Sequence, residues 1–340
     1  MTPELAMPPK SRHWLRWGCG LGLFVVLLFT GFLAHVLSKS NRENPAIERL
    51  RGVADYSGGE TPMLSLPRFV PTRIQSLLPQ RLTINGVRFR SGTQNPRRYL
   101  RDITALQLTH FEIVESDLAP TDLEEFSRQS GLRSMKIRKC KLADGSRSRL
   151  QNLPRLMHLS LERSTMSPKD EIDFPTLPQL VSLNLSRCNV SEQTLRRISD
   201  HPQIRTIDLN SSTVTDEALK HLRRLPQREK IHLGKNWITG IGLVNLEAPV
   251  TKIYLYGTNA DDVAMTVISG LSSLQSLDLE DTRVTTLGVR KLQQLPNIQE
   301  LDLDGCPLGD EVREILSAMP HLTRWTAQRT RVSLPNTSGL

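Results

Sequence analysis

The sequence predicts an α/β solenoid, with short parallel strands on the concave face of a horseshoe and helices on its convex face. The first observation is an apolar pattern, Leu180-x-x-Leu183-x-Leu185, that recurs mostly every 24 residues. The second is composition, because aromatic residues make up only 5% of the chain and aliphatic side chains must therefore fill the core. A fixed period of this size is typical of stacked structural repeats.

The period is measured between the middle apolar residues of successive units, here called the central residues. They are Leu106, Met135, Leu159, Leu183, Ile207, Ile231, Ile253, Leu277, Leu301 and Trp325. The intervals between them are 29, 24, 24, 24, 24, 22, 24, 24 and 24 residues. We therefore expect ten strand units. The spacing between the first and second units is longer than the other spacings.

Each unit contains the signals for one strand and one helix. Ile207-Asp-Leu209 alternates apolar and polar residues, which predicts a short strand with its two apolar side chains inward. Thr215 follows a short turn and offers a hydroxyl group that can cap a helix. Leu219 and Leu222 lie three residues apart, on the face of the helix that would pack against the strand.

This order of strand, turn and helix resembles the leucine-rich repeat family. The resemblance covers about residues 103–333 and implies a horseshoe with a helical outer face. The family's asparagine, three residues after the last strand leucine, is present as Asn236, and the first unit has Phe111 in this column. Small side chains occupy the same column elsewhere: Cys140, Ser164, Cys188, Ser212, Thr258, Thr282, Cys306 and Thr330. We expect them to bond backbone groups in the turns, and the cysteines to lie too far apart for disulfides.

A transmembrane helix is predicted before the repeats. Residues 17–37 form a run of 21 residues without a formal charge, which would span about 31 Å as a helix. A cleaved signal peptide is the alternative, but the apolar core is long and a cut after Ala34 would place Phe32 at the −3 position. The full predicted division is a tail (1–16), the span (17–37), a tether (38–66), a basic segment and cap (67–101), the repeats (102–333) and a C-terminal tail (334–340).

Charge around the predicted span leaves its orientation nearly balanced. Three Lys or Arg residues precede it closely and four follow it. A short tail before the first apolar segment favours repeats on the non-cytoplasmic side. The reversed topology would instead give a scaffold that faces the cytosol.

The basic balance of the chain comes from the segment before the repeats. Residues 61–101 contain eight arginines and no acid, whereas residues 102–340 contain 29 basic and 30 acidic residues. The arginines are candidates for contact with anionic lipid or an acidic wall polymer, and nucleic acid is not favoured as a partner. They are Arg68, Arg73, Arg81, Arg88, Arg90, Arg97, Arg98 and Arg101. Asn85-Gly86 predicts a hairpin turn in a short cap.

Outward positions beside the strand leucines are the candidate binding residues. Bases cluster in early units at Lys136, Arg138, Lys139, Arg163 and Arg187. Acids cluster in two late units at Asp278, Glu280, Asp281, Glu300, Asp302 and Asp304, and Tyr254 and Tyr256 lie between the two groups. Like charges on adjacent strands are destabilising, which favours a basic protein or peptide partner. The alternatives are a solvated face and a calcium site, although a sheet splays the oxygens that calcium needs.

No catalytic motif accompanies these features. The sequence contains no G-x-x-x-x-G-K-[ST], H-E-x-x-H or G-x-S-x-G pattern, so we expect no enzymatic activity, metal or cofactor. The sequence therefore predicts a membrane-anchored repeat protein that binds a macromolecule on its concave face. The alternative is a structural envelope protein or spacer that contacts an anionic surface through its basic segment.

Overall fold

The computed structural model describes residues 54–62, 80–89, 108–127, 130–143, 145, 149–150, 153–165, 176–225, 229–246 and 249–330. The chain divides into two compact units, residues 1–49 with 58–84, and residues 50–57 with 85–340. The described parts of the first unit belong to strands β1 and β2. The second unit contains all the other described strands and helices.

One sheet runs through the described repeats. It has 12 strands in the order β1-β2-β3-β5-β7-β8-β9-β10-β11-β12-β13-β14, and β4 and β6 form a separate pair. The strands are β1 (Ala54–Pro62), β2 (Gln80–Phe89), β3 (His110–Val114), β4 (Asp117–Leu118), β5 (Ser134–Arg138), β6 (Lys141–Leu142), β7 (His158–Ser160), β8 (Ser182–Asn184), β9 (Thr206–Asp208), β10 (Lys230–His232), β11 (Lys252–Tyr254), β12 (Ser276–Asp278), β13 (Glu300–Asp302) and β14 (Arg324–Thr326). From β2 to β14 each neighbouring pair is parallel.

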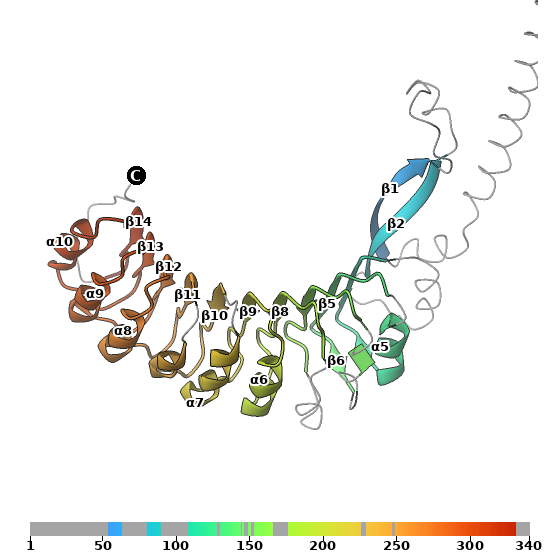
Figure 1. The fold of residues 1–340 in the computed structure, drawn as a ribbon, viewed down its shortest axis with the longest axis horizontal. Coiled ribbons are helices and arrows are strands. Elements are labelled where there is room, and N and C mark those ends of the chain that lie inside the picture. Colours follow the sequence, from blue (N-terminus) through green and yellow to red (C-terminus); the bar gives the residue numbers. More distant parts are fainter. Residues whose placement is uncertain are drawn as a thin grey trace, which may run out of the picture. The chain divides into compact units, whose positions relative to one another are not determined.

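Helices follow most of these strands and lie on the opposite side of the repeats from the sheet (Figure 1). They are α5 (Pro120–Ser127), α6 (Glu192–Ile198), α7 (Asp216–Leu219), η3 (Lys220–Arg224), η4 (Ile241–Asn245), α8 (Asp262–Ile268), α9 (Thr286–Leu292) and α10 (Val312–Ser317), where η denotes a 3-10 helix. The predicted cap is confirmed, because the Thr215 hydroxyl accepts a hydrogen bond from the Ala218 amide at 3.3 Å. Leu219 and Leu222 are both fully buried.

The strand register confirms nine of the ten predicted central residues and corrects the first. Met135 aligns with Phe111 in β3, 24 residues earlier, so the prediction of Leu106 with a 29-residue interval was wrong. Phe111 is the central residue of that strand, and Ser116 occupies the column that had been assigned to Phe111. An aromatic side chain fills this place because Phe111 packs against Phe126, with ring centroids 4.1 Å apart.

Strand β2 extends the same register by one further step of 24 residues. Val87 aligns with Phe111, and Gly86 aligns with His110. The predicted hairpin turn at Asn85-Gly86 is therefore wrong, because both residues lie inside β2. Glycine has no side chain, so Gly86 hides the alternation of apolar and polar residues along the strand. An Asn-Gly pair is also common in hairpin turns, and the local sequence therefore favoured a turn.

Small polar side chains join adjacent repeats beneath the strand ends. The hydroxyls of Ser164 and Ser212 donate to backbone carbonyls of the preceding repeat at 3.1 and 2.7 Å. The Cys188 and Cys306 thiols donate in the same way at 2.9 and 3.1 Å. These side chains are buried, so each contact satisfies a carbonyl that water cannot reach. The predicted role of the column is confirmed, and Cys140, Cys188 and Cys306 are buried thiols.

A left-handed residue ends the strand region of every repeat from β3 to β14. It lies four positions after the central residue and has φ between 53° and 71°. The ten are Glu115, Lys139, Arg163, Arg187, Ser211, Lys235, Gly257, Asp281, Gly305 and Arg329. Such a conformation costs a non-glycine residue about 1 kcal/mol. Its amide donates to the next repeat, for example Arg163 to Ser186 at 2.9 Å and Asp281 to Asp304 at 2.7 Å, which offsets that cost.

The predicted transmembrane segment, residues 17–37, lies outside the described residues. Within the described ranges, no helix combines the length and the hydropathy that crossing a bilayer requires.

Candidate functional site

The strand face presents one continuous row of side chains, formed by the residue that directly follows each central residue. We call it the central row. Its described members are Arg88, Glu112, Lys136, Ser160, Asn184, Asp208, His232, Tyr254, Asp278, Asp302 and Thr326, and each is in register with the next. Alternation along a strand directs these side chains away from the core. Adjacent members are therefore about 5 Å apart along the row.

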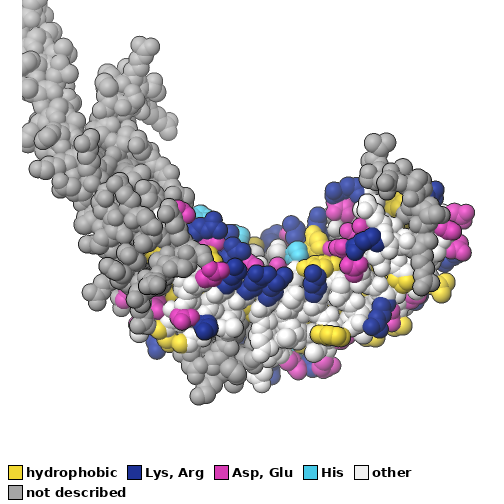
Figure 2. Space-filling model, turned by 180° about the vertical axis from the view of Figure 1, so that it is seen from behind, with side chains coloured by type: hydrophobic (Ala, Val, Ile, Leu, Met, Phe, Trp, Pro, Cys, Tyr) yellow, Lys and Arg dark blue, Asp and Glu magenta, His cyan; other side chains and the backbone are white. Residues whose placement is uncertain are grey.

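Three of the six predicted acidic residues are neutralised by arginines of the last repeat. Arg324 pairs with Glu300. Arg329 pairs with Glu280 at 2.6 Å and with Asp281 at 3.3 Å. Figure 2 shows acidic side chains beside Lys and Arg side chains at the right-hand end of the repeats. The sequence interpretation treated the acids of β12 and β13 as unneutralised because it considered only the bases of those two units.

Asp278, Asp302 and Asp304 are the three that remain, and Asp278 and Asp302 form the charged centre of this end. They face each other across the β12–β13 pair, and no described Lys or Arg lies within ion-pair distance of either carboxylate. One oxygen of each accepts the amide two residues later, from Glu280 and from Asp304, at 3.0 Å in both cases. Asp302 also accepts the Thr326 hydroxyl at 2.7 Å. The backbone contact holds each carboxylate in place, and the second oxygen of each has no hydrogen bond to a described residue.

A cavity of about 310 Å³ lies over these carboxylates. Tyr254, Asp278, Asp302 and Thr326 line it from the central row, and the ion pair of Glu300 with Arg324 lies beside them. Burial raises the pKa of Asp278 from its ordinary 3.8 to about 6, and the charges of Asp302, Glu280 and Asp304 act in the same direction. A buried negative charge that lacks a cation is electrostatically unfavourable, and a ligand cation would relieve it.

We predict that Asp278→Asn stabilises the protein at neutral pH and leaves the fold intact. The raised pKa means that the folded state binds a proton more tightly than the unfolded state. Ionised Asp278 therefore destabilises the fold above pH 6, and this penalty disappears as the pH falls from about 6 to about 4. Discounted for solvent, it is on the order of 1 kcal/mol, or about 2–4 °C in Tm. Thermal unfolding at pH 7 and pH 4.5 should show that the variant's advantage is about three times smaller at the lower pH.

An internal precedent supports the intact fold of this variant. Asn184 occupies the same place in β8, and its Oδ1 accepts the Ser186 amide at 2.8 Å. An asparagine at position 278 can therefore keep the bond to the Glu280 amide. A variant that unfolds, or one whose advantage at pH 4.5 is as large as at pH 7, would contradict this account of Asp278.

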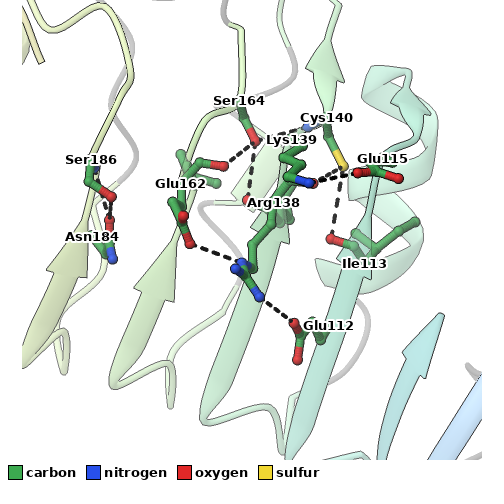
Figure 3. A network of polar contacts seen from close by, with 12 residues as sticks. Glu112, Ile113, Glu115, Arg138, Lys139, Cys140, Glu162, Ser164, Asn184 and Ser186 are labelled. Carbon is green, nitrogen blue, oxygen red and sulfur yellow. Dashed lines mark hydrogen bonds and ion pairs between the residues drawn. The ribbon is translucent and has the colours of Figure 1, made fainter. Parts of the chain in front are cut away.

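The basic end of the strand face contains bases that differ in their pairing (Figure 3). Arg138 lies between two acids, at 3.3 Å from Glu112 and 2.9 Å from Glu162. Lys139 pairs with Glu115 at 2.8 Å. In contrast, Lys136, Arg163 and Arg187 have no ion pair with a described acid. The predicted basic group therefore contains two bases that are already neutralised and three that are available.

The two tyrosines occupy different environments between the charged ends. Tyr254 stacks on His232, with ring centroids 4.2 Å apart and an angle of 4° between the planes. Tyr256 lies against Gly234, where a Cβ atom would come within 2.3 Å of its ring. Glycine at position 234 thus makes room for Tyr256, and the Lys235 ammonium lies 5.7 Å from the same ring centroid. The stack and the small residue beneath Tyr256 were not recognised from the sequence.

Comparison with known proteins agrees with this geometry. Residues 248–308 match the family model described as leucine rich repeat. This part of the chain therefore carries leucine-rich repeats. The match covers β11, β12 and β13, and the same register continues through the other described strands of the sheet from β2 onward. No match is found among curated protein sequences.

Solved structures share the leucine-rich repeat fold at low sequence identity. A chain of the mouse RP105/MD-1 complex is 16% identical, with a TM-score of 0.53 over 69% of this chain. A chain of a TLR13–ssRNA13 complex is 16% identical, with a TM-score of 0.52 over 70% of this chain. This chain spans 41% and 35% of those two chains. An internalin from Listeria monocytogenes is 18% identical, with a TM-score of 0.45, over 74% of this chain and 82% of its own.

The arginines predicted to contact an anionic surface are largely outside the described residues. Arg88 is described, and its guanidinium pairs with Glu112 at 3.1 Å. Arg81 lies within β2, in a part of the strand whose side chains are not described. The remaining six are Arg68, Arg73, Arg90, Arg97, Arg98 and Arg101. Among the described residues, no group of three or more His, Cys, Asp or Glu side chains could hold a metal ion.

Proposed function

We propose that the leucine-rich repeat domain binds a basic segment of a protein or peptide on its concave strand face. The observation that carries the proposal is the cavity of about 310 Å³ over Asp278 and Asp302. A lysine or arginine side chain fits its chemistry, because two fixed carboxylates face each other and Arg324, the arginine in the lining, is paired with Glu300. The raised pKa of Asp278 supports the same proposal, since a bound cation would favour the ionised form.

The Tyr254 side chain gives this cavity a second means of recognition. It forms the wall on the side of β11. The ring of Tyr254 is held by its stack on His232, so little side-chain freedom is lost on binding. An aromatic face next to carboxylates suits a cation with an apolar stem, as in lysine and arginine.

Replacing both Asp278 and Asp302 by asparagine tests the proposal. The probe is a fluorescein-labelled peptide with three lysines separated by glycines, titrated against the full-length protein by fluorescence anisotropy. Loss of two contacts to a cation should weaken binding at least tenfold, and wild-type binding should weaken between 50 and 300 mM salt. Tyr254→Ala should weaken it further through lost contact area.

The matched control replaces Glu311 and Glu314 by glutamine. Both lie at α10, on the helical side of the repeats, and both are exposed. The control changes the net charge by the same amount and should bind the peptide within twofold of wild type. If the double asparagine variant folds and binds as tightly as wild type, the acidic cavity is only a solvated surface.

A membrane-anchored location completes the proposed function, with the repeats on the non-cytoplasmic side. Its support is the sequence of residues 17–37, whose 21 residues carry no formal charge and whose length suits a bilayer. The expected result is that the protein stays in the membrane fraction after carbonate extraction, with its N-terminus intact. A soluble product that begins near residue 35 would show that the segment is cleaved.

A further inference from the structure

A second cavity on the strand face has the opposite chemistry. It has a volume of about 420 Å³ and lies around Ser160 of the central row. Its walls are polar and are formed by Ser134, Lys136, Arg138, His158, Glu162, Ser182 and Asn184. Arg138 and Glu162 neutralise each other at 2.9 Å. The exposed Lys136 is then the cavity's charged group without a described partner, and the cavity as a whole favours an anion.

The central row itself explains why the two cavities differ. Asn184, Asp278 and Asp302 each use one oxygen to accept the amide two residues later. The side-chain group without this backbone contact is the amide NH₂ at Asn184. At Asp278 and Asp302 it is the second carboxylate oxygen. No described residue accepts a hydrogen bond from the Asn184 amide group in the structure. The same backbone geometry therefore presents a donor at one cavity and acceptors at the other.

The separation of the cavities matches a short extended peptide. Five strand spacings separate β7, beneath the first cavity, from β12, beneath the second. At about 4.8 Å each, they amount to roughly 24 Å, which an extended chain covers in about seven residues. Between the cavities the row contains Asp208 and His232, and the His232 ring stacks on Tyr254 at the edge of the second cavity. These rings give the middle of the row an apolar surface over which a peptide backbone can lie.

We infer that the two cavities bind one extended peptide segment, with a carboxylate side chain over Ser160 and a lysine or arginine over Asp278 and Asp302. This inference rests on the proposed function. It adds that the bound peptide carries opposite charges at its two ends and specifies the distance between them. Lys136, the Asn184 amide group and the serine hydroxyls would receive the carboxylate. A charge-assisted contact with Lys136 together with neutral hydrogen bonds is sufficient for about a tenfold gain in affinity.

Three fluorescein-labelled peptides in a glycine-serine background test the inference against the full-length protein. The first has two lysines only, the second adds two glutamates seven residues away, and the third adds them two residues away. The second peptide is made in both chain directions. One direction should bind about tenfold more tightly than the lysine-only peptide, and the third peptide should show no gain.

Two variants assign this gain to the cavity around Ser160. Lys136→Ala and Asn184→Asp should each abolish the gain and leave binding of the lysine-only peptide unchanged. Asn184→Asp keeps an oxygen for the Ser186 amide, as Asp208 does for Asn210 at 3.0 Å in the next repeat, so the fold is maintained. Lys141→Ala removes an exposed lysine of the same repeat, on β6, and should preserve the gain.

The outcomes separate the two proposals. If the lysine-only peptide fails to bind wild type, the proposed function is wrong. If it binds but the glutamates add nothing, or if their gain survives in Lys136→Ala, the inference about the second cavity is wrong and the proposed function stands. A Lys136-dependent affinity for a ten-nucleotide oligothymidylate that exceeds the affinity for every peptide would also overturn the inference, because the cavity would then take phosphate.

Discussion

Replacing Asp216 by alanine is expected to lower the free energy of unfolding by about 3 kcal/mol. The carboxylate joins α7 to the following repeat through four hydrogen bonds. It accepts the Thr239 amide and hydroxyl, both at 2.8 Å, and the amides of Gly240 and Gly242, at 3.0 and 3.1 Å. Alanine would leave three backbone amides without this acceptor at the start of η4. Urea unfolding of the full-length protein, followed by circular dichroism, measures the loss.

The contact cannot easily be replaced, because the two repeats approach closely at this point. A Cβ atom on Gly242 would come within 2.3 Å of the Asp216 backbone carbonyl oxygen. The backbone of η4 therefore lies directly against α7, and its amides cannot move far toward other acceptors. Glu217→Ala is the control, because Glu217 is the exposed neighbour of Asp216 and pairs with Lys220. This variant should change the free energy of unfolding by less than about 0.5 kcal/mol. Equal losses in the two variants would show that Asp216 is not the link between the repeats.

The repeat period made most of the fold predictable, and the failures have physical causes. From Met135 onward each central residue is aliphatic or has an aliphatic residue two positions later, so the strand register follows directly. At the N-terminal side, the central residue Phe111 packs on an aromatic partner, Phe126. Glycine interrupts the alternation in β2. Aliphatic periodicity alone therefore missed β1, which lies within the predicted tether (38–66), and β2, and it displaced β3.

The candidate site was less predictable because it depends on contacts between repeats. The outward direction of Asp278 and Asp302 follows from alternation along each strand. In contrast, the neutralisation of Glu280 and Asp281 depends on the reach of Arg329, which is 49 residues from Glu280 in sequence. The Ser186 amide donates to the Asn184 side-chain oxygen, which leaves the Asn184 NH₂ group facing the first cavity. The donor character of that cavity therefore depends on a backbone contact. Neither property can be read from a single repeat.

A second large loss of stability is expected at Asn236, which lies beneath the strand ends. Its side-chain amide nitrogen donates to the carbonyls of Leu209 and Leu233, both at 2.8 Å. Its oxygen accepts the Ser212 amide at 2.8 Å. The residue is only 3% exposed, so water cannot replace these bonds. Asn236→Ala should therefore cost about 3 kcal/mol, because it leaves two carbonyls and one amide unsatisfied in the core.

Two further substitutions at position 236 separate hydrogen bonding from loss of volume. Threonine is native to this column, and the Thr258 hydroxyl donates to the Leu255 carbonyl of its own repeat at 2.7 Å. Asn236→Thr should restore the bond to Leu233 and lose roughly half as much stability as alanine. Asn236→Asp keeps the volume and the acceptor for Ser212 but turns a carboxylate oxygen toward two carbonyls, so at neutral pH it should be the least stable of the three. If aspartate proved as stable as threonine in urea unfolding at pH 7, packing and not the two donated hydrogen bonds would explain why asparagine is needed here.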